Sequence, residues 1–196
     1  MTILVTAFDP FGGDEANISQ QLLEALPEEL DGAALHKLLL PTVFGKAAER
    51  AIAEAERIHP GAIVCLGQAG GRTAITPERI GINCMDASLP DNAGRQPRDK
   101  AILPGGPAAY FATLPLRDMA EAILAAGVPA QISNTAGTFV CNSLLYNLLH
   151  FTASAAPEVP CGFLHLPCPD AASGLSREAL LRGLIAALRV LTQKRQ

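Results

Sequence analysis

Tryptophan is missing from this 196-residue sequence, and aromatic residues make up only 5% of it. Charge is also sparse, because charged residues account for 17% against 49% for hydrophobic residues. A chain this apolar is not intrinsically disordered, and its length suits one ordinary domain with a core of its own. We therefore expect a single domain over residues 1–196.

Basic clusters and long apolar segments are lacking as well. The net charge is −4, and the longest basic run is Lys194 and Arg195 at the C-terminus. This pattern attracts neither nucleic acid nor an anionic membrane. No apolar stretch has the length of a transmembrane helix, and MTILV at residues 1–5 has no charged start of a signal peptide. We expect neither a nucleic-acid nor a membrane partner.

The five cysteines are odd in number, and the chain is not small. Both facts argue against a disulfide framework and favour a reducing cytoplasm. Most free cysteines behave as small buried hydrophobic residues, so we expect most of these to be inert.

Strand-length apolar runs alternate with helical periodicity along the chain. Strands are expected at 3–8, 38–44, 62–68, 130–134 and 162–166, with an extended piece at 75–84. Helices are expected after Asn17 or Ser19 and at 45–58, 116–126, 139–151 and 176–194. This alternation predicts a single-domain three-layer α/β/α sandwich with a mostly parallel, mixed central sheet.

The segments that follow strands are where chemistry is expected in such a sheet. Residues 8–13, 68–72, 134–141 and 165–168 should converge on one edge, beyond the carboxyl ends of the strands. Residues 85–107, rich in Pro, Gly and Asp, predict a long irregular loop with the composition of a mobile flap.

Cys141 differs from the other cysteines by its position. Residues 134–142 lead from a strand through a glycine turn into a helix, and with Thr138 as the N-cap Cys141 falls in the first turn. Unpaired N–H groups and the helix dipole favour a thiolate there and could stabilise an oxyanion. Cys141 is therefore a candidate nucleophile; the alternative is that it packs the core.

A base for this thiol is found by elimination among four histidines. His150 lies on the same helix, about half a turn round and roughly 13 Å away. His59 lies at a helix end before a proline, and His36 is expected on the surface at the start of a strand. His165, near the end of the last strand, remains as the base; the alternative is a buried structural histidine.

A metal site formed by Cys161, His165 and Cys168 is a competing interpretation. Side chains alternate along a strand, so Cys168 would point away unless the strand broke early. The metal interpretation is therefore disfavoured.

Glu78 is a candidate for orienting the imidazole. An extended segment at 78–82 would place its carboxylate on the apolar face of Ile80 and Ile82, where it needs a partner. Thr76 and Pro77 could instead begin a helix. The residues alone do not select Glu78 over other acids.

Seven separated segments resemble the pyrrolidone-carboxylate peptidase (pyroglutamyl peptidase I) family over nearly the whole chain. They are TAFDPFGG (6–13), GQAGGR (67–72), ITPERI (75–80), PDNAG (90–94), GGPAAYF (105–111), SNTAGTFVCN (133–142) and GFLHLP (162–167). The resemblance implies a catalytic triad of Glu78, Cys141 and His165. The implied activity is removal of N-terminal pyroglutamyl residues from peptides. The resemblance implies no metal or cofactor. It also implies a cytoplasmic location and a homo-oligomer, either a tetramer or a dimer.

Substrate-binding residues also follow from the resemblance. They are Phe8, Phe11, Gln68, Leu89, Phe139 and Val140. Pyroglutamate is a neutral flat lactam, which suits apolar and aromatic walls with a few polar contacts. Core packing is the alternative for Phe8 and Phe11, but two of only seven phenylalanines on one Gly-Gly loop favour a binding role.

Three positions depart from the family pattern. Ala7 and Asp9 replace Gly and Glu, which are mild changes. Ser88 stands where the family has an arginine, and serine cannot mimic a guanidinium. Activity could then be reduced or could depend on another cation such as Arg79.

Two other functions stay open from the sequence. An α/β enzyme could bind phosphate or a nucleoside at Gly12 and Gly13 or at Gly70 and Gly71, although neither pair completes a known phosphate-binding fingerprint. A silent binding protein, suggested by Ser88, would hold pyroglutamyl peptides without turnover.

Overall fold

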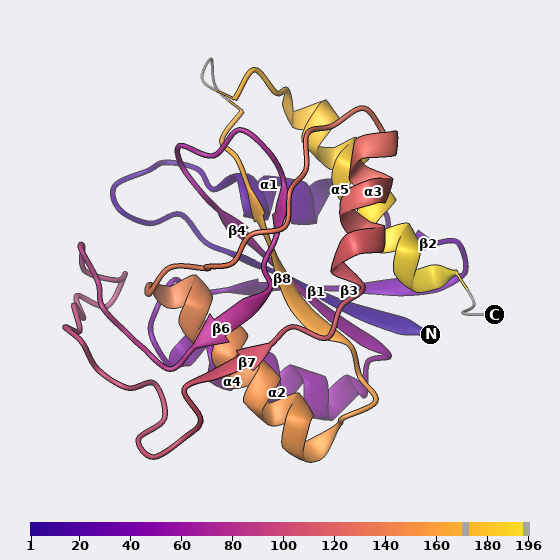
Figure 1. Cartoon of the computed structure of the whole chain (residues 1–196). Helices are drawn as coiled ribbons and strands as arrows, with labels where there is room; N and C mark the ends of the chain where they lie inside the picture. Colours follow the sequence, from indigo (N-terminus) through magenta and orange to yellow (C-terminus); the bar gives the residue numbers. More distant parts are fainter. Residues whose placement is uncertain (170–172, 194–196) are drawn as a thin grey trace.

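A six-stranded sheet forms the centre of the protein in the computed structural model, which describes residues 1–169 and 173–193 (Figure 1). The strand order is β2 (Glu29–Leu30), β3 (Ala33–Leu40), β1 (Thr2–Phe8), β4 (Ala62–Gln68), β8 (Cys161–Leu166) and β5 (Thr76–Pro77). The four central strands pair in parallel, whereas β2 and β5 pair antiparallel with their neighbours at the two edges. The predicted mixed, mostly parallel sheet is confirmed.

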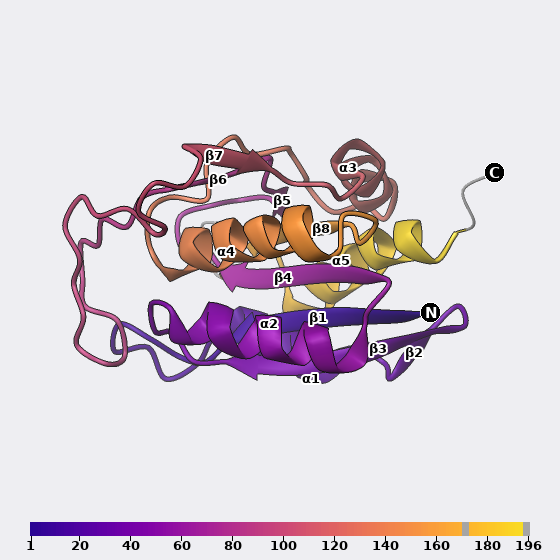
Figure 2. The same ribbon diagram turned by 90° about the horizontal axis from the view of Figure 1, so that it is seen from below.

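Helices cover both faces of this sheet. One face packs against α1 (Ile18–Ala25), α3 (Leu116–Ala125) and α5 (Arg177–Thr192), and the other against α2 (Lys46–Ile58) and α4 (Val140–Ala155). Figure 2 shows α2 and α4 lying over the sheet from the second side. A separate two-stranded sheet joins β6 (Ile80–Ile82) to β7 (Ala109–Phe111). The predicted α/β/α sandwich is confirmed.

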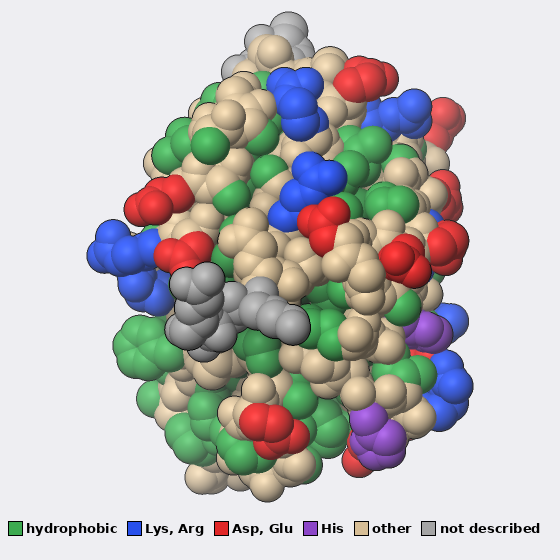
Figure 3. Space-filling view, turned by 90° about the vertical axis from the view of Figure 1, so that its right-hand side faces the viewer, with side chains coloured by type: hydrophobic (Ala, Val, Ile, Leu, Met, Phe, Trp, Pro, Cys, Tyr) green, Lys and Arg blue, Asp and Glu red, His purple; other side chains and the backbone are tan. Residues whose placement is uncertain are grey.

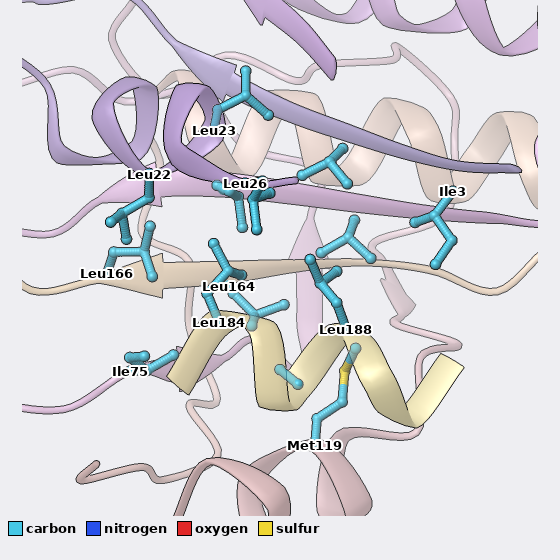
Figure 4. Close-up of a cluster of buried hydrophobic side chains, with 14 of the residues drawn as sticks. Ile3, Leu22, Leu23, Leu26, Ile75, Met119, Leu164, Leu166, Leu184 and Leu188 are labelled. Atoms are coloured by element: carbon cyan, nitrogen blue, oxygen red, sulfur yellow. The ribbon is translucent and has the colours of Figure 1, made fainter. Parts of the chain in front are cut away.

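The central strands are apolar along their whole length because both of their faces are buried. On the α5 side, leucines of β8 and α5 interdigitate with leucines of α1 (Figure 4). A fully buried leucine contributes about 1.5–3 kcal/mol relative to an exposed one. This burial on both faces holds the central strands in place, and the strands in turn position the loops that follow their carboxyl ends.

Two predicted strands differ from the structure. The strand expected at 38–44 is β3, which begins five residues earlier because Ala33–Leu40 pairs with the full length of β1. The strand expected at 130–134 forms only two isolated bridges, Ile75 with Ala130 and Glu78 with Ser133. Pro77 lies between these bridges and has no N–H to donate, so a regular ladder cannot form there.

The helices begin within a residue or two of their predicted starts, and Ser176 caps α5, but α4 extends four residues beyond its predicted end at 151. The basic run of Lys194 and Arg195 lies outside the described residues. Among the described residues, no helix has the length and apolar character needed to cross a membrane.

The parallel strands all point toward the side on which the irregular segment 85–107 projects (Figure 2). The opposite side, where the strands begin and the N-terminus lies, shows acidic and basic side chains interspersed with apolar ones (Figure 3). Functional residues that follow strands are thereby gathered at one edge of the sheet.

Candidate active site

Cys141 lies in the first turn of α4, which begins at Val140. The predicted cap was displaced by one residue, since Phe139 is the N-cap and Thr138 instead donates its hydroxyl to the Asp86 carbonyl at 2.7 Å. Among the described residues no side chain caps this helix, so the N–H groups of its first turn lack a capping partner. The position predicted for Cys141 is confirmed, although the predicted cap is wrong.

The Cys141 thiol is half-buried. Burial raises the pKa of the thiol to about 12, and the negative charge of Glu78 acts in the same direction. The backbone N–H of Cys141 and the charge of Arg72 oppose this shift but do not outweigh it. The helix start alone therefore does not produce a thiolate, and the thiol needs a base.

His165 lies on β8 and is only 5% exposed. Its Nδ1 is 2.7 Å from Glu78 Oε1. Because an ionised carboxylate only accepts hydrogen bonds, Nδ1 carries the proton and Nε2 keeps its lone pair. Burial lowers the pKa of His165, whereas the hydrogen bond to Glu78 raises it. A neutral imidazole with a free Nε2 lone pair has the form required of a general base.

Gly67 on β4 is a neighbour of both His165 and Cys141. It is paired in register with His165 on β8. A β-carbon built on Gly67 would lie 3.0 Å from Cys141 Sγ and 2.6 Å from the ring of Phe163. His165 and Cys141 therefore border the same strand residue, and only glycine leaves room for the sulfur. Within the described residues, no hydrogen bond joins this sulfur to the imidazole; such contacts often tighten only with substrate bound.

Glu78 is completely buried and follows β5 in an extended segment. The alternative of a helix beginning at Thr76 is thus excluded. Glu78 Oε1 accepts hydrogen bonds from His165 Nδ1 at 2.7 Å and from Arg72 Nη1 at 2.6 Å. Glu78 Oε2 has no partner among the described residues. A buried carboxylate needs such partners to stay in the fold.

Arg72 was not singled out by the sequence reasoning. Its Nη1 also donates to the Thr76 hydroxyl, and its Nη2 donates to the Thr135 carbonyl at 3.1 Å. The guanidinium therefore joins the loop after β4, the strand β5 and the segment before α4. The one available signal was its place in the motif GQAGGR after a buried strand.

The other histidines lie elsewhere, and two of them have partners of their own. His150 Nδ1 lies 2.8 Å from the Tyr110 hydroxyl, His36 Nε2 pairs with Glu54 at 2.5 Å, and His59 is exposed. They agree with the elimination made from the sequence, except that His36 is half-buried.

The alternative metal site is excluded by the strand itself. Because β8 runs unbroken from Cys161 to Leu166, four residues of strand separate the α-carbons of Cys161 and His165 by about 13 Å. The described part of the chain contains no cluster of three or more metal-ligating His, Cys, Asp or Glu side chains.

An aromatic group lies beside the start of α4. The Phe139 ring is 5.8 Å from the ring of Phe11 and 5.3 Å, edge-on, from that of Phe44. Phe44 was missed by the sequence reasoning. Phe8 is only 2% exposed and packs against Phe163 at 6.4 Å, so it belongs to the core beneath this group. Of the two phenylalanines in the first motif, only Phe11 is partly exposed.

The Gln68 amide is already engaged within the protein. Its Oε1 accepts from Ile18 N at 3.0 Å, and its Nε2 donates to Asp14 Oδ2 at 3.0 Å. Gln68 therefore holds the loop between β1 and α1 in place. Val140 is buried at the start of α4, and Leu89 lies against the Gly12 turn.

The segment 85–107 is fastened at its tip. Asp91 Oδ2 accepts from Phe44 N at 2.9 Å, and Asn92 Nδ2 donates to Asp9 Oδ1 at 3.1 Å and to the Pro10 carbonyl at 2.8 Å. The predicted flap thus touches the loops after β1 and β3 in this structure.

In the described part of the chain, neither residue discussed for the missing family arginine has a side-chain hydrogen bond or ion pair with Glu78 or His165. Ser88 is exposed and has no polar partner in the described ranges. Arg79 Nε donates to Asn134 Oδ1 at 2.7 Å. The cation that contacts Glu78 is Arg72, not Arg79.

Asn142 is a further residue that the sequence did not single out by role. This buried side chain accepts from Ile82 N and donates to the carbonyls of Ile82 and Cys84, each at 2.9 Å. These three hydrogen bonds tie the first turn of α4 to β6 and thereby fix the position of the neighbouring Cys141.

Comparisons with known proteins agree with this geometry. A family model described as pyroglutamyl peptidase matches residues 1–192. The pyrrolidone-carboxylate peptidase of Levilactobacillus brevis is 45% identical over 97% of each chain, and that of Streptococcus pyogenes is 45% identical over 96% of this chain and 91% of the relative.

Solved structures give the same result. Pyroglutamyl peptidase I from Bacillus amyloliquefaciens has a TM-score of 0.92 at 39% identity, with 98% of this chain and 95% of that chain covered. Pyrrolidone carboxyl peptidase from Pyrococcus furiosus has a TM-score of 0.91 at 36% identity, with 98% of both chains covered. The resemblance found in the sequence is confirmed, and the chain belongs to the pyroglutamyl peptidase family.

Proposed function

We propose that this protein is a cysteine peptidase that removes N-terminal pyroglutamyl residues from peptides, with Cys141 as nucleophile, His165 as base and Glu78 as the residue that orients the imidazole. The buried Glu78–His165 hydrogen bond of 2.7 Å, beside the first turn of α4, carries the proposal. Membership of the pyroglutamyl peptidase family supports the substrate class.

The first half of the reaction forms a thioester. Because the Cys141 thiol is neutral, its proton passes to His165 Nε2 as the sulfur attacks the pyroglutamyl carbonyl carbon. Glu78 stabilises the imidazolium that results. The negative oxygen of the tetrahedral intermediate is held by the uncapped N–H groups at the start of α4.

The second half releases both products. The imidazolium of His165 gives its proton to the departing amine, and the shortened peptide leaves with a free N-terminus. Water then loses a proton to His165 Nε2 and attacks the thioester. Collapse of this second intermediate yields pyroglutamate and returns the proton to the Cys141 sulfur.

The aromatic group fits the lactam ring. Phe11, Phe44 and Phe139 offer apolar surface, and the backbone of Phe139 and Val140 offers polar groups for the lactam amide. Because pyroglutamate has no free α-amine, no acidic anchor is required. We propose that Leu89 closes this pocket beside Gly12, while Phe8 supports it from the core and Gln68 shapes the loop that carries Phe11.

The phosphate-binding alternative is not favoured by the Gly12–Gly13 turn. Phosphate sites need free N–H groups at a helix start. The first N–H groups of α1 are occupied, because Ile18 N donates to Gln68 and Ser19 N donates to Asn17. The Gly-Gly turn therefore serves to place Phe11.

Hydrolysis of pyroglutamyl-7-amido-4-methylcoumarin by the purified chain tests the proposal. The wild type should release the fluorophore, and Cys141→Ala should not. Cys84→Ser is the matched control, since Cys84 is also half-buried but is not placed in the triad. The prolyl amide, which lacks the lactam carbonyl, should react far more slowly.

Absence of turnover by the wild type, or equal turnover by Cys141→Ala, would contradict the proposal. Binding of a pyroglutamyl peptide without turnover would identify a silent binding protein. The homo-oligomer, the absence of a nucleic-acid partner and the cytoplasmic location stay predictions of the sequence and its resemblance.

A further inference from the structure

Arg72 and His165 share one oxygen of Glu78. Arg72 Nη1 lies 2.6 Å and His165 Nδ1 lies 2.7 Å from Oε1. The carboxylate side chain is 0% exposed and the guanidinium side chain is 26% exposed. Glu78 is therefore shielded from solvent, whereas Arg72 is partly exposed.

Because Oε2 of Glu78 has no partner among the described residues, the two contacts at Oε1 alone compensate the buried carboxylate. A buried carboxylate is stable only when it is paired with a cation and hydrogen-bonded. Arg72 is the cation paired with Glu78 in the described residues, because a neutral His165 adds a hydrogen bond but no charge. With Arg72 in place the buried pair is neutral overall, and His165 has no need to hold a second proton.

Two further contacts fix the guanidinium. Nη1 donates to the hydroxyl of Thr76, whose residue pairs in register with His165, and Nη2 donates to the Thr135 carbonyl. Thr135 lies in the segment that leads into α4 and Cys141. A single side chain therefore connects the strand of the base with the segment of the nucleophile.

We propose that Arg72 is a positioning residue that acts through Glu78, keeping His165 neutral and oriented toward Cys141. This inference rests on the peptidase function proposed above and adds a residue with no previous role in it. Lysine would supply the charge but not the planar fork that reaches Thr135 at the same time.

The charged and titratable groups near the imidazole set the direction in which the pKa of His165 should move when Arg72 is replaced. Glu78 faces it from the segment after β5, Arg72 from the loop after β4, and the Cys141 thiol from α4. The positive charge of Arg72 lowers the pKa of His165 and that of the Cys141 thiol. Removing this charge should raise both pKa values, so neutral His165 should require a higher pH.

The pH dependence of kcat/KM for the pyroglutamyl coumarin amide tests this inference. In Arg72→Gln the acid limb should move to higher pH by about half to one unit. Its kcat should fall on the order of ten- to a hundredfold, with a smaller change in KM. Arg72→Lys should restore the position of the limb and only part of kcat. Arg79→Gln is the matched control, because Arg79 contacts Asn134 and not Glu78.

A substrate-free measurement separates this inference from the proposed function. The NMR titration of His165 Cε1–H, assigned by its loss in His165→Asn, should shift to a higher midpoint in Arg72→Gln and return in Arg72→Lys. A shifted midpoint without turnover by the wild type would support the role of Arg72 and contradict the peptidase. Wild-type turnover with an unmoved midpoint and limb would contradict the role of Arg72 alone. Should Arg72→Gln fail to fold, Arg72→Lys with wild-type kcat would also overturn it.

Discussion

The ring of Phe163 occupies the space that a side chain at Gly67 would need, since a β-carbon there would lie 2.6 Å from Phe163 Cζ. Both residues lie on paired central strands, so neither backbone can move aside easily. The same β-carbon would lie 3.0 Å from Cys141 Sγ. Position 67 therefore has no space for a side chain between Phe163 and Cys141.

Gly67→Ala should lower both stability and activity. Overpacking of this kind costs about 1–3 kcal/mol, and the displaced sulfur should reduce kcat more than KM. Thermal unfolding and steady-state kinetics measure the two effects. Gly70→Ala is the control, because a β-carbon at Gly70 meets no atom within 4 Å. An alanine variant at position 67 with wild-type melting and turnover would contradict the close packing described here.

The pH dependence of alkylation reports the state of the thiol. Because burial raises the pKa of Cys141 to about 12, the thiolate fraction is small near neutral pH and grows as pH rises. Carbamidomethylation of Cys141 by iodoacetamide, followed by mass spectrometry, should therefore accelerate steadily above pH 8. A plateau already reached below pH 7 would instead reveal a resting thiolate–imidazolium pair and would overturn the general-base mechanism.

Sequence patterns predicted the elements of this site that depend on local position. A strand expected at 130–134 and a glycine turn after it placed Cys141 at a helix start, and elimination selected His165. Cys141 does lie in the first turn of α4, although residues 130–134 form only two isolated bridges. These inferences used only periodicity along the chain, which the sheet then converted into proximity at one edge. Selection of Glu78 needed the family resemblance, because several acids were compatible with the residues alone.

Residues whose roles depend on contacts between distant segments were not predicted. Arg72 is important because it reaches Glu78 and Thr135, and Asn142 because it binds β6. Neither contact leaves a periodic trace in the sequence. The Gln68 amide likewise holds the distant Asp14 and Ile18, and the substrate-binding role that the resemblance implies for Gln68 stays a prediction.

Asn142→Asp should unfold the start of α4. The amide nitrogen donates to two carbonyls, and a buried carboxylate in its place would face both oxygens without a donor. Leaving such groups unsatisfied costs about 1–3 kcal/mol each, and more for a charged group. Urea unfolding should show this loss. Asn147→Asp on the same helix is the control, since Asn147 donates only to the Ser143 carbonyl and is half-buried. Equal stability of the two variants would contradict the anchoring role.

Glu78→Gln should preserve the shape of the site and remove its charge. Arg72 would then be left beside a neutral amide, and the imidazolium formed in the reaction would lose its stabilising partner. Removal of the carboxylate charge from a comparable triad lowers kcat by roughly ten-thousandfold, so a loss on the order of a thousandfold or more is expected here. Thermal unfolding should confirm that the variant folds. A folded Glu78→Gln variant with kcat near that of the wild type would remove Glu78 from the mechanism.

Replacing each of the two phenylalanines of the first motif by leucine should have different effects on stability and on KM. Phe8 is buried against Phe163, so Phe8→Leu should lower stability by about 1 kcal/mol or more and change KM little. Phe11 is partly exposed and contacts Phe139 at 5.8 Å, so Phe11→Leu should raise KM for the pyroglutamyl amide several-fold with little change in melting temperature. The KM and the melting temperature of each variant are measured. A raised KM in Phe8→Leu with no change in Phe11→Leu would reverse the assignment and place the lactam ring deeper, against β1.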